Sequence, residues 1–173
     1  MIIIAIGSNL PHPVQGQPTQ VCRSAVSTIA KCDCVILKQS RWYRSAAVPA
    51  SSQPDFVNGV IGISSSLCPS DLMQKLHKIE AKYGRERAMP NAARVLDLDL
   101  VAYDNVVREE PEWPSLPHPR ISQRAFVLYP LRDIMPVWRH PATGVELNDL
   151  ISALPKDFNC VPIARPEVCQ YGE

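Results

Sequence analysis

The chain has 173 residues, of which 46% are hydrophobic and 20% are charged, and its formal net charge is +1. This length suits one domain with its own hydrophobic core, and the composition is that of an ordinary globular protein. A charge so close to zero gives no general electrostatic reason to expect binding to nucleic acid or to an anionic membrane.

In the first part of the chain, the sequence predicts a strand, a helix and then two further strands. The apolar run at 1–6 is too short to span a bilayer or to serve as a signal peptide, and it predicts a buried strand. An apolar stripe predicts a helix over 19–31, with Pro18 at a tolerated first position. Strands are predicted over 34–44 and 56–64. The second of these is expected to show four residues on one face: Phe56, Asn58, Val60 and Gly62.

The middle of the chain predicts a helix followed by a strand. The helix begins at Pro69 and ends at Gly84, a residue that commonly terminates helices. The stretch RVLDLDLVAYD at 94–104 predicts a strand, and Asp104 with Asn105 predicts a turn into a short return strand.

The last part of the chain is expected to be helical and then irregular. Helices are predicted over about 121–134 and 146–154, and residues 155–173 are predicted to form an irregular tail. The order of elements, βαββαβ with a terminal helical part, predicts an α+β sandwich with helices packed on an antiparallel or mixed sheet.

The cysteines show no regular framework. The close pair, Cys32 and Cys34, is separated by one residue, which is not the spacing of a zinc site. Free thiols in a reducing cytoplasm are therefore expected.

Two aspartates interrupt the apolar strand predicted over 94–104. Strand alternation puts Asp97 and Asp99 on one face, about 6–7 Å apart, and puts the leucines with Arg94 and Ala102 on the other. Two like charges at this spacing need water, a cationic side chain or a metal ion nearby. Because Mg²⁺ is held by one or two carboxylates plus substrate phosphates, the pair is a candidate metal site. A solvated edge strand, whose charges only limit aggregation, is the simpler alternative.

Three arginines lie close to this pair in the sequence: Arg85, Arg87 and Arg94. A guanidinium binds phosphate oxygens bidentately, although such a run is often just solvated surface. Beside two carboxylates, the arginines suit metal–triphosphate chemistry, which needs charge neutralisation and positioning above all. The sequence contains neither GxxxxGK[ST] nor GxGxxG, so a P-loop or Rossmann nucleotide site is not expected.

Six segments together carry a resemblance to a known family: IAIGSNL at 4–10, QPDFVNGV at 53–60, IEAKYGRER at 79–87, RVLDLDLV at 94–101, LPHPRISQRAFVLYPL at 116–131 and I-x-P at 134–136. In this order the chain resembles the 6-hydroxymethyl-7,8-dihydropterin pyrophosphokinases over about residues 2–154. The resemblance implies a ferredoxin-like α+β fold and a single domain over 1–173. It also implies a cytoplasmic, monomeric enzyme of folate biosynthesis that transfers pyrophosphate from MgATP to hydroxymethyldihydropterin and leaves AMP.

The resemblance also implies roles for matched positions. Asp97 and Asp99 would bind two Mg²⁺ ions, and Arg85 and Arg94 would brace the phosphates during catalysis. ATP would be bound by those two arginines and by further residues: His77, Glu80, Arg87, Leu100, Ser115, His118 and Arg124. The pterin would lie between two aromatic rings and beside polar groups: Phe56, Phe126, Asn58, Asp97 and the backbone of Ser45, Ala46 and Val48.

Two other functions stay open. The chain departs from the family pattern in the shorter loop at 91–93, at Trp113 and at Pro119, so a non-catalytic relative that binds pterin or nucleotide is an alternative. A Mg-dependent nucleotidyltransferase also combines Asp-x-Asp with a Gly-Ser such as that at 7–8, although the two motifs stand far apart here. Small molecules are the expected partners in each case, without nucleic acid or membrane.

Overall fold

The structure, a computed structural model, describes residues 1–48, 51–85, 92–155 and 159–164. Its strands are β1 (Ile2–Ser8), β2 (Cys34–Gln39), β3 (Tyr43–Ser45), β4 (Phe56–Ser65), β5 (Asp97–Tyr103) and β6 (Cys160–Pro162). Its α-helices are α1 (Pro18–Ile29), α2 (Pro69–Lys82), α3 (Ala125–Ile134) and α4 (Leu147–Ser152), and a 3₁₀ turn, η1 (Ile121–Gln123), precedes α3.

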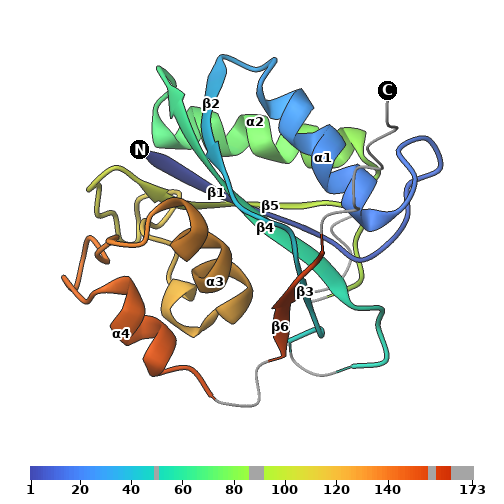
Figure 1. Ribbon diagram of the computed structural model, residues 1–173. Helices are drawn as coiled ribbons and strands as arrows, with labels where there is room; N and C mark the ends of the chain where they lie inside the picture. The colour runs from blue at the N-terminus through green and yellow to red at the C-terminus, as the bar shows by residue number, and fades with distance from the viewer. Residues whose placement is uncertain (49–50, 86–91, 156–158, 165–173) are drawn as a thin grey trace, which may run out of the picture.

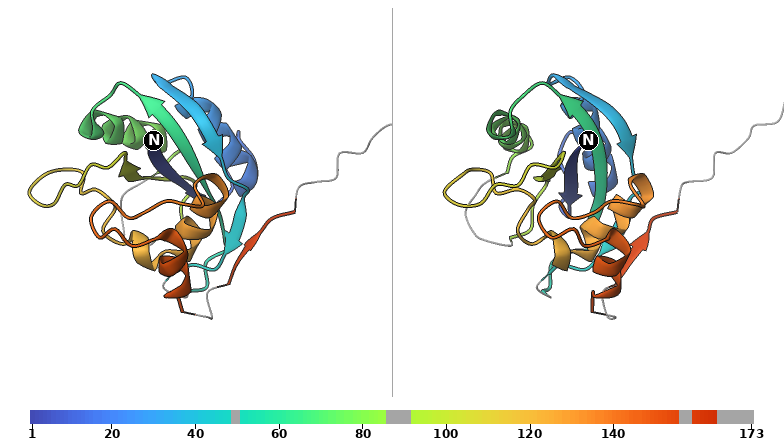
Figure 2. Two further views of the ribbon diagram at one scale, coloured as in Figure 1. Left: turned by 60° about the vertical axis from the view of Figure 1, so that its left-hand side comes forward. Right: turned by 90° about the vertical axis from the view of Figure 1, so that its left-hand side faces the viewer.

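The strands form one antiparallel sheet in the order β5-β1-β4-β3-β6, and β2 pairs with β4 beside β3. Helices α1 and α2 cover one face of this sheet, whereas α3 and α4 cover the other (Figure 1). The turned views of Figure 2 show the same separation. The predicted α+β fold, with helices packed on an antiparallel sheet, is therefore confirmed.

Strand β1 lies in the middle of the protein and packs on both faces. Ile2, Ile4 and Ile6 belong to the core under α1 and α2. Ile3 belongs to the second core, under α3 and α4. The residues that follow Ile3 on this second face are Ala5, with only a methyl group, and Gly7, with no side chain, so the packed core gives way to open space toward the end of the strand.

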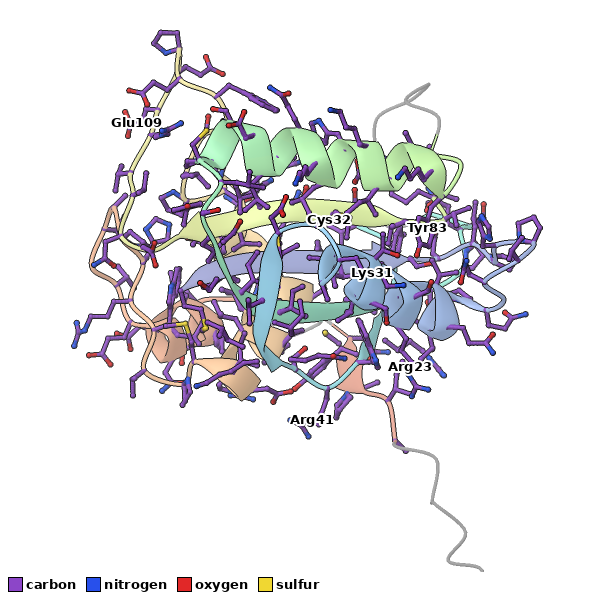
Figure 3. The ribbon with its side chains drawn as sticks, turned by 90° about the horizontal axis from the view of Figure 1, so that it is seen from above. Arg23, Lys31, Cys32, Arg41, Tyr83 and Glu109 are labelled. Atoms are coloured by element: carbon purple, nitrogen blue, oxygen red, sulfur yellow. The ribbon has the colours of Figure 1, made fainter. Side chains whose placement is uncertain are left out.

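The end of α2 is tied to α1 by Tyr83. Its hydroxyl lies 2.9 Å from Ser24 Oγ and 3.0 Å from Thr28 Oγ1, both on α1. Figure 3 shows Tyr83 between the two helices. Gly84 follows with a positive φ of 78°, so the chain can leave the helix sharply at the predicted residue.

The strand predicted over 34–44 is divided into β2 and β3. Gln39 pairs with Ile61 and Tyr43 pairs with Asn58. Between these two pairs, the segment that joins β2 to β3 contains one residue more than the part of β4 opposite it. At the break, Ser40 Oγ accepts a hydrogen bond from Val60 N–H at 2.9 Å. The extra residue lets the buried ring of Trp42 turn inward, against Gly59.

One prediction for β5 was wrong at its far end. Leu98 and Leu100 pack under α1 and α2 as expected, but Ala102 packs on the other face with Val101. The cause is a bulge, because Ile3 pairs with Ala102 and Ile4 pairs with Leu100, which leaves Val101 as an extra residue.

The second half differs from the predictions in three further places. The expected return strand after β5 is reduced to a bridge between Arg108 and Leu116. The helix predicted over 121–134 is divided into η1 and α3. The tail, predicted to be irregular, contains β6, which extends the sheet beside β3.

Two sequence expectations can be compared with the described part of the chain. Its cysteines, at positions 22, 32, 34, 68 and 160, are free. Within the same residues, no helix is both long enough and apolar enough to cross a membrane.

Candidate active site

A cavity of about 350 Å³ lies on the α3 side of the sheet. Residues predicted as site residues line most of it: Ser45, Ala46, Val48, Phe56, Asn58, Arg85, Arg94, Asp97, Asp99, Arg124 and Phe126. They come from β3 and the segment after it, β4, β5, the segments before β5 and the start of α3, so the fold brings together segments that are distant in sequence. The cavity has a charged end around the two aspartates, and a flat, less charged end around Phe56 and Asn58.

The floor between these two ends is made by Gly7 of β1. Gly7 pairs with Asp97 on one side and with Asn58 on the other. A Cβ atom on Gly7 would lie 3.4 Å from Asn58 Oδ1 and 3.7 Å from Asp97 Cβ. Sequence reasoning missed Gly7 as a lining residue, although a glycine inside a strand is a signal for close approach of another group.

At the charged end, two arginines share the carboxylate of Asp97. Arg85 Nη1 lies 2.6 Å from Asp97 Oδ1, and Arg94 Nη1 lies 3.1 Å from the same oxygen. Arg94 had been expected on the leucine face, opposite the aspartates. That prediction was wrong because β5 begins only at Asp97, and the chain bends at Val95.

Glu80 contacts Arg85 but does not itself line the cavity. Its side chain is only 2% exposed, and its carboxylate forms an ion pair with Arg85. The same carboxylate accepts a hydrogen bond from Leu98 N–H at 2.7 Å. Since β5 is at the edge of the sheet, Glu80 supplies a partner that a neighbouring strand would otherwise provide, and it positions Arg85 at the same time.

Asp99 has its partners in the segment before α3. Arg124 Nη1 lies 2.6 Å from Asp99 Oδ2. Burial would raise the pKa of the Asp99 carboxyl, but the charge and hydrogen bond of Arg124 outweigh it, so this pKa lies below its ordinary value. Asp99 is therefore ionised at neutral pH.

His118 lies beside the same carboxylate as a neutral imidazole. Burial, and then the charge of Arg124, lowers the pKa of His118 below its ordinary value. Its Nδ1 accepts a hydrogen bond from Arg120 N–H at 3.1 Å, which assigns the proton to Nε2. Nε2 lies 4.0 Å from Asp99 Oδ2, so it faces the charged end as a potential donor.

Arg120 is a further guanidinium on the cavity wall that sequence reasoning missed. It forms no ion pair with any carboxylate in the described ranges, in contrast to Arg85, Arg94 and Arg124. Its charge contributes to the low pKa of His118. Ala47 and Gln123 also line the cavity and were also missed, because their residue types carry no chemical signal of their own.

The other end of the cavity suits a flat, polar heterocycle. Phe56 at the start of β4 and Phe126 at the start of α3 both line it. Asn58 is 6% exposed, and its Nδ2 donates to Ser45 Oγ at 3.0 Å. A buried amide held in one orientation beside aromatic rings can read the polar edge of a ring system.

Five predicted nucleotide contacts do not line the cavity: His77, Glu80, Leu100, Ser115 and His118, the last of which lies beside Asp99. Leu100 is buried in the core under α1 and α2. His77 lies on α2, with its ring 5.7 Å from that of Trp113. Arg87 lies outside the described residues.

The donor set at Asp97 and Asp99 fits a hard divalent cation. The two side chains are 26% and 25% exposed on one strand face, so their oxygens can be reached from the cavity. Mg²⁺ is commonly held by one or two carboxylates and takes its other ligands from phosphate and water. β5 is an edge strand, as the simpler alternative required, but its aspartates are paired with arginines and line a cavity.

Comparison with known proteins agrees with this geometry. Residues 3–136 match the family described as 7,8-dihydro-6-hydroxymethylpterin-pyrophosphokinase. The 2-amino-4-hydroxy-6-hydroxymethyldihydropteridine pyrophosphokinase of Synechocystis sp. is 36% identical over 86% of this chain and 73% of that protein. The protein of the same name from Pseudomonas aeruginosa is 35% identical over 89% of this chain and 91% of that protein. The folic acid synthesis protein fol1 of Pneumocystis carinii is 34% identical over 84% of this chain, which spans 19% of that longer protein.

Proposed function

The chain belongs to the 7,8-dihydro-6-hydroxymethylpterin-pyrophosphokinase family, and we propose that it transfers pyrophosphate from ATP to 6-hydroxymethyl-7,8-dihydropterin in folate biosynthesis. One observation carries this proposal beyond the family match. A single cavity joins a cluster of arginines and carboxylates to an aromatic and amide-lined end, as a reaction between a triphosphate and a flat heterocycle requires.

The charged end is proposed to bind the phosphate chain. Arg85, Arg94 and Arg124 are held by carboxylates, whereas Arg120 has no acidic partner among the described residues. The four arginines and two aspartates that line the cavity leave a net positive charge there. Such a charge attracts a nucleoside triphosphate, and planar guanidiniums match the geometry of its oxygens.

Asp97 and Asp99 are proposed to hold two Mg²⁺ ions together with ATP. When bound, the ions would neutralise phosphate charge and favour loss of the proton from the pterin hydroxyl. The guanidiniums that now pair with Asp97 and Asp99 must release these oxygens to do so, and phosphate oxygens offer them new partners. Arginine and carboxylate thus exchange partners when metal and triphosphate arrive together.

The other end is proposed to hold the pterin. Phe56 and Phe126 would cover the faces of the ring, and Asn58 would hydrogen-bond its edge. Ser45, Ala46 and Val48, which line the same end, would contribute backbone contacts. With the ring fixed in this way, the hydroxymethyl oxygen would point along the floor of Gly7 toward Asp97.

The transfer itself makes one bond and breaks one. The pterin hydroxyl oxygen attacks the β-phosphorus, the bond from that phosphorus to the oxygen bridging to the α-phosphorus breaks, and AMP leaves with both electrons of that bond. The hydroxyl proton is released. Arg85, Arg94 and neutral His118 would stabilise the negative charge that develops on the phosphate oxygens.

The open alternatives are less well supported. A nucleotidyltransferase would use Gly7 and Ser8 at the phosphates, but Ser8 is fully buried and its hydroxyl donates to Leu10 O at 3.3 Å. A non-catalytic relative would not need the paired arginines and carboxylates, all of which are in place. A monomeric state and a cytoplasmic location stay predictions.

The test is incubation of the protein with ATP, Mg²⁺ and hydroxymethyldihydropterin, followed by separation of the products. We expect AMP and pterin diphosphate in equal amounts, formed only when the pterin is present. Bound pterin without AMP would favour the non-catalytic relative. Release of inorganic pyrophosphate, with the nucleotide attached to an acceptor, would favour the nucleotidyltransferase.

A further inference from the structure

Asn9 is a buried polar residue to which no role in the reaction has been assigned above. It follows β1 directly and is only 2% exposed. Ser8, the residue before it, pairs with Val57 of β4, so Asn9 lies where the pairing of the two strands ends. A buried amide must satisfy both its donors and its acceptor, so its partners show what it holds in place.

One set of partners belongs to the charged end of the cavity. Asn9 Oδ1 accepts a hydrogen bond from Arg94 N–H at 2.8 Å. The backbone N–H groups of Asn9 and Leu10 donate to Arg94 O at 3.1 and 3.3 Å. Both backbone polar groups of Arg94 are therefore bonded to this segment, which directs the Arg94 guanidinium to Asp97.

The other partners belong to the segment that leads into the flat end. Asn9 Nδ2 donates to Gln53 Oε1 at 3.2 Å and to Pro54 O at 3.1 Å. Pro54 stands two residues before Phe56, which begins β4 and lines the cavity. The amide of Asn9 thus joins two segments that are distant in sequence and that belong to opposite ends of the cavity.

We propose that Asn9 is a positioning residue that fixes the phosphate end of the cavity relative to the pterin end. This inference rests on the proposed function, since in-line transfer requires the pterin oxygen and the phosphorus to be aligned. A displacement of about 1 Å between two reacting groups is enough to slow a reaction by about 100-fold. Each end has contacts that do not involve the Asn9 side chain, because the backbone N–H groups at positions 9 and 10 bond Arg94 O, and Phe56 pairs with Ser45.

The test uses Asn9→Asp, which has the same shape. An aspartate oxygen can still accept from Arg94 N–H, but its second oxygen faces Pro54 O, a carbonyl that can only accept, and repels it. The matched control is Asn105→Asp, at an exposed residue in the turn after β5. A second variant, Gln53→Ala, removes one acceptor and leaves the bonds to Pro54 and Arg94 intact.

Three quantities separate positioning from a general structural role. They are kcat per pterin-binding site, the affinity for an ATP analogue with a methylene group between the α- and β-phosphorus atoms, and the affinity for pterin in the presence of that analogue. For Asn9→Asp we expect kcat to fall about 10-fold to 100-fold, with both affinities within about 3-fold of wild type. Gln53→Ala should show a smaller loss of kcat in the same pattern, and Asn105→Asp should show none.

Two results would overturn the inference. If Asn9→Asp and Gln53→Ala keep the wild-type kcat per binding site, or if they lose both affinities in proportion to activity, Asn9 only stabilises the fold. A wild-type protein that makes no AMP would instead overturn the proposed function, and this inference with it. An active wild type therefore distinguishes failure of the inference from failure of the function.

Discussion

The two ends of the cavity are stabilised in different ways before any substrate binds. At the charged end, guanidiniums and carboxylates neutralise one another across 2.6–3.1 Å. At the flat end, Asn58 is already held by Ser45, and the ring centre of Phe126 lies 5.6 Å from the guanidinium carbon of Arg124. Phosphate and metal must therefore replace existing ion pairs, whereas a pterin can enter a site that is already arranged. Changes at the two ends should have separable effects.

The largest effect is expected from Asp97→Asn. This change removes a proposed metal ligand and a partner of Arg85 and Arg94 while it keeps the shape of the side chain. Activity should fall by about 1000-fold, because several kcal/mol of transition-state charge stabilisation are lost. The melting temperature should change little, since the leucines on the opposite face hold the strand. The control is Asp149→Asn, at an exposed residue of α4. If Asp97→Asn is much less stable but keeps its activity per folded molecule, Asp97 has a structural role instead.

Asn58→Ala should affect the flat end alone. The change removes the amide that is proposed to read the pterin edge, and it leaves Ser45 without that partner. We expect the KM for pterin to rise about 10-fold to 100-fold, as is usual when a site loses a hydrogen bond to its substrate. The KM for ATP should stay within about 2-fold. Equal rises in both KM values, measured by steady-state kinetics, would remove the distinction between the two ends.

Arg124→Gln should change metal binding and nucleotide binding in opposite directions. Without the guanidinium, the Asp99 carboxylate is free to accept Mn²⁺, which should bind about 10-fold more tightly in the absence of nucleotide. ATP should bind about 10-fold more weakly, because a cation of the phosphate site is lost. Electron paramagnetic resonance of free Mn²⁺ and equilibrium titration with ATP measure the two effects. The control is Arg132→Gln, at an exposed arginine of α3. If Mn²⁺ and ATP both bind more weakly to Arg124→Gln than to the wild type, the proposed exchange of partners between arginine and carboxylate is contradicted.

The smallest effect on activity is expected from Asp133→Asn, which lies on α3 and is not a cavity-lining residue. Burial would raise the pKa of Asp133, but hydrogen bonds from Arg41 and Tyr43 outweigh it and lower this pKa below its ordinary value. A depressed carboxyl pKa stabilises the fold above the pKa of the unfolded chain, and this stabilisation is lost as the pH falls through the folded value. The variant should therefore unfold about 1 kcal/mol more easily than wild type at pH 7.

That difference should start to shrink below about pH 4, where the unfolded chain takes up the proton first, and should vanish only below the lower pKa of the folded state. Urea unfolding at several pH values measures it. Kinetic constants for both substrates should stay at the wild-type level. A difference in stability that does not change with pH would mean that the Asp133 charge has no part in it.

Relations between side chains on the same strand were predictable from the sequence, at both ends of the cavity. Alternation along β5 places Asp97 and Asp99 on one face, and alternation along β4 does the same for Phe56 and Asn58. These relations depend only on local backbone geometry. They hold wherever the strand is regular, and they fail at the bulge at Val101, because pairing with β1 sets the register there.

Relations between distant segments were not predictable from patterns alone. The pairing of Asp99 with Arg124 depends on how α3 packs on the sheet, and the family resemblance placed Arg124 only among the nucleotide contacts. Gly7 lines the cavity because β1 lies between β4 and β5, a topology that periodicity does not specify. Strand β6 is three residues long, so its pairing with β3 left no readable pattern in the sequence.

The most direct test of the account follows label from ATP into the products. The protein is incubated with Mg²⁺, hydroxymethyldihydropterin and ATP that carries ³²P at either the α- or the γ-position. The account predicts that γ-label appears in the pterin product and that α-label stays in AMP, in equal amounts. Appearance of α-label in the pterin product, or of γ-label as free phosphate without modified pterin, would contradict pyrophosphate transfer in this cavity.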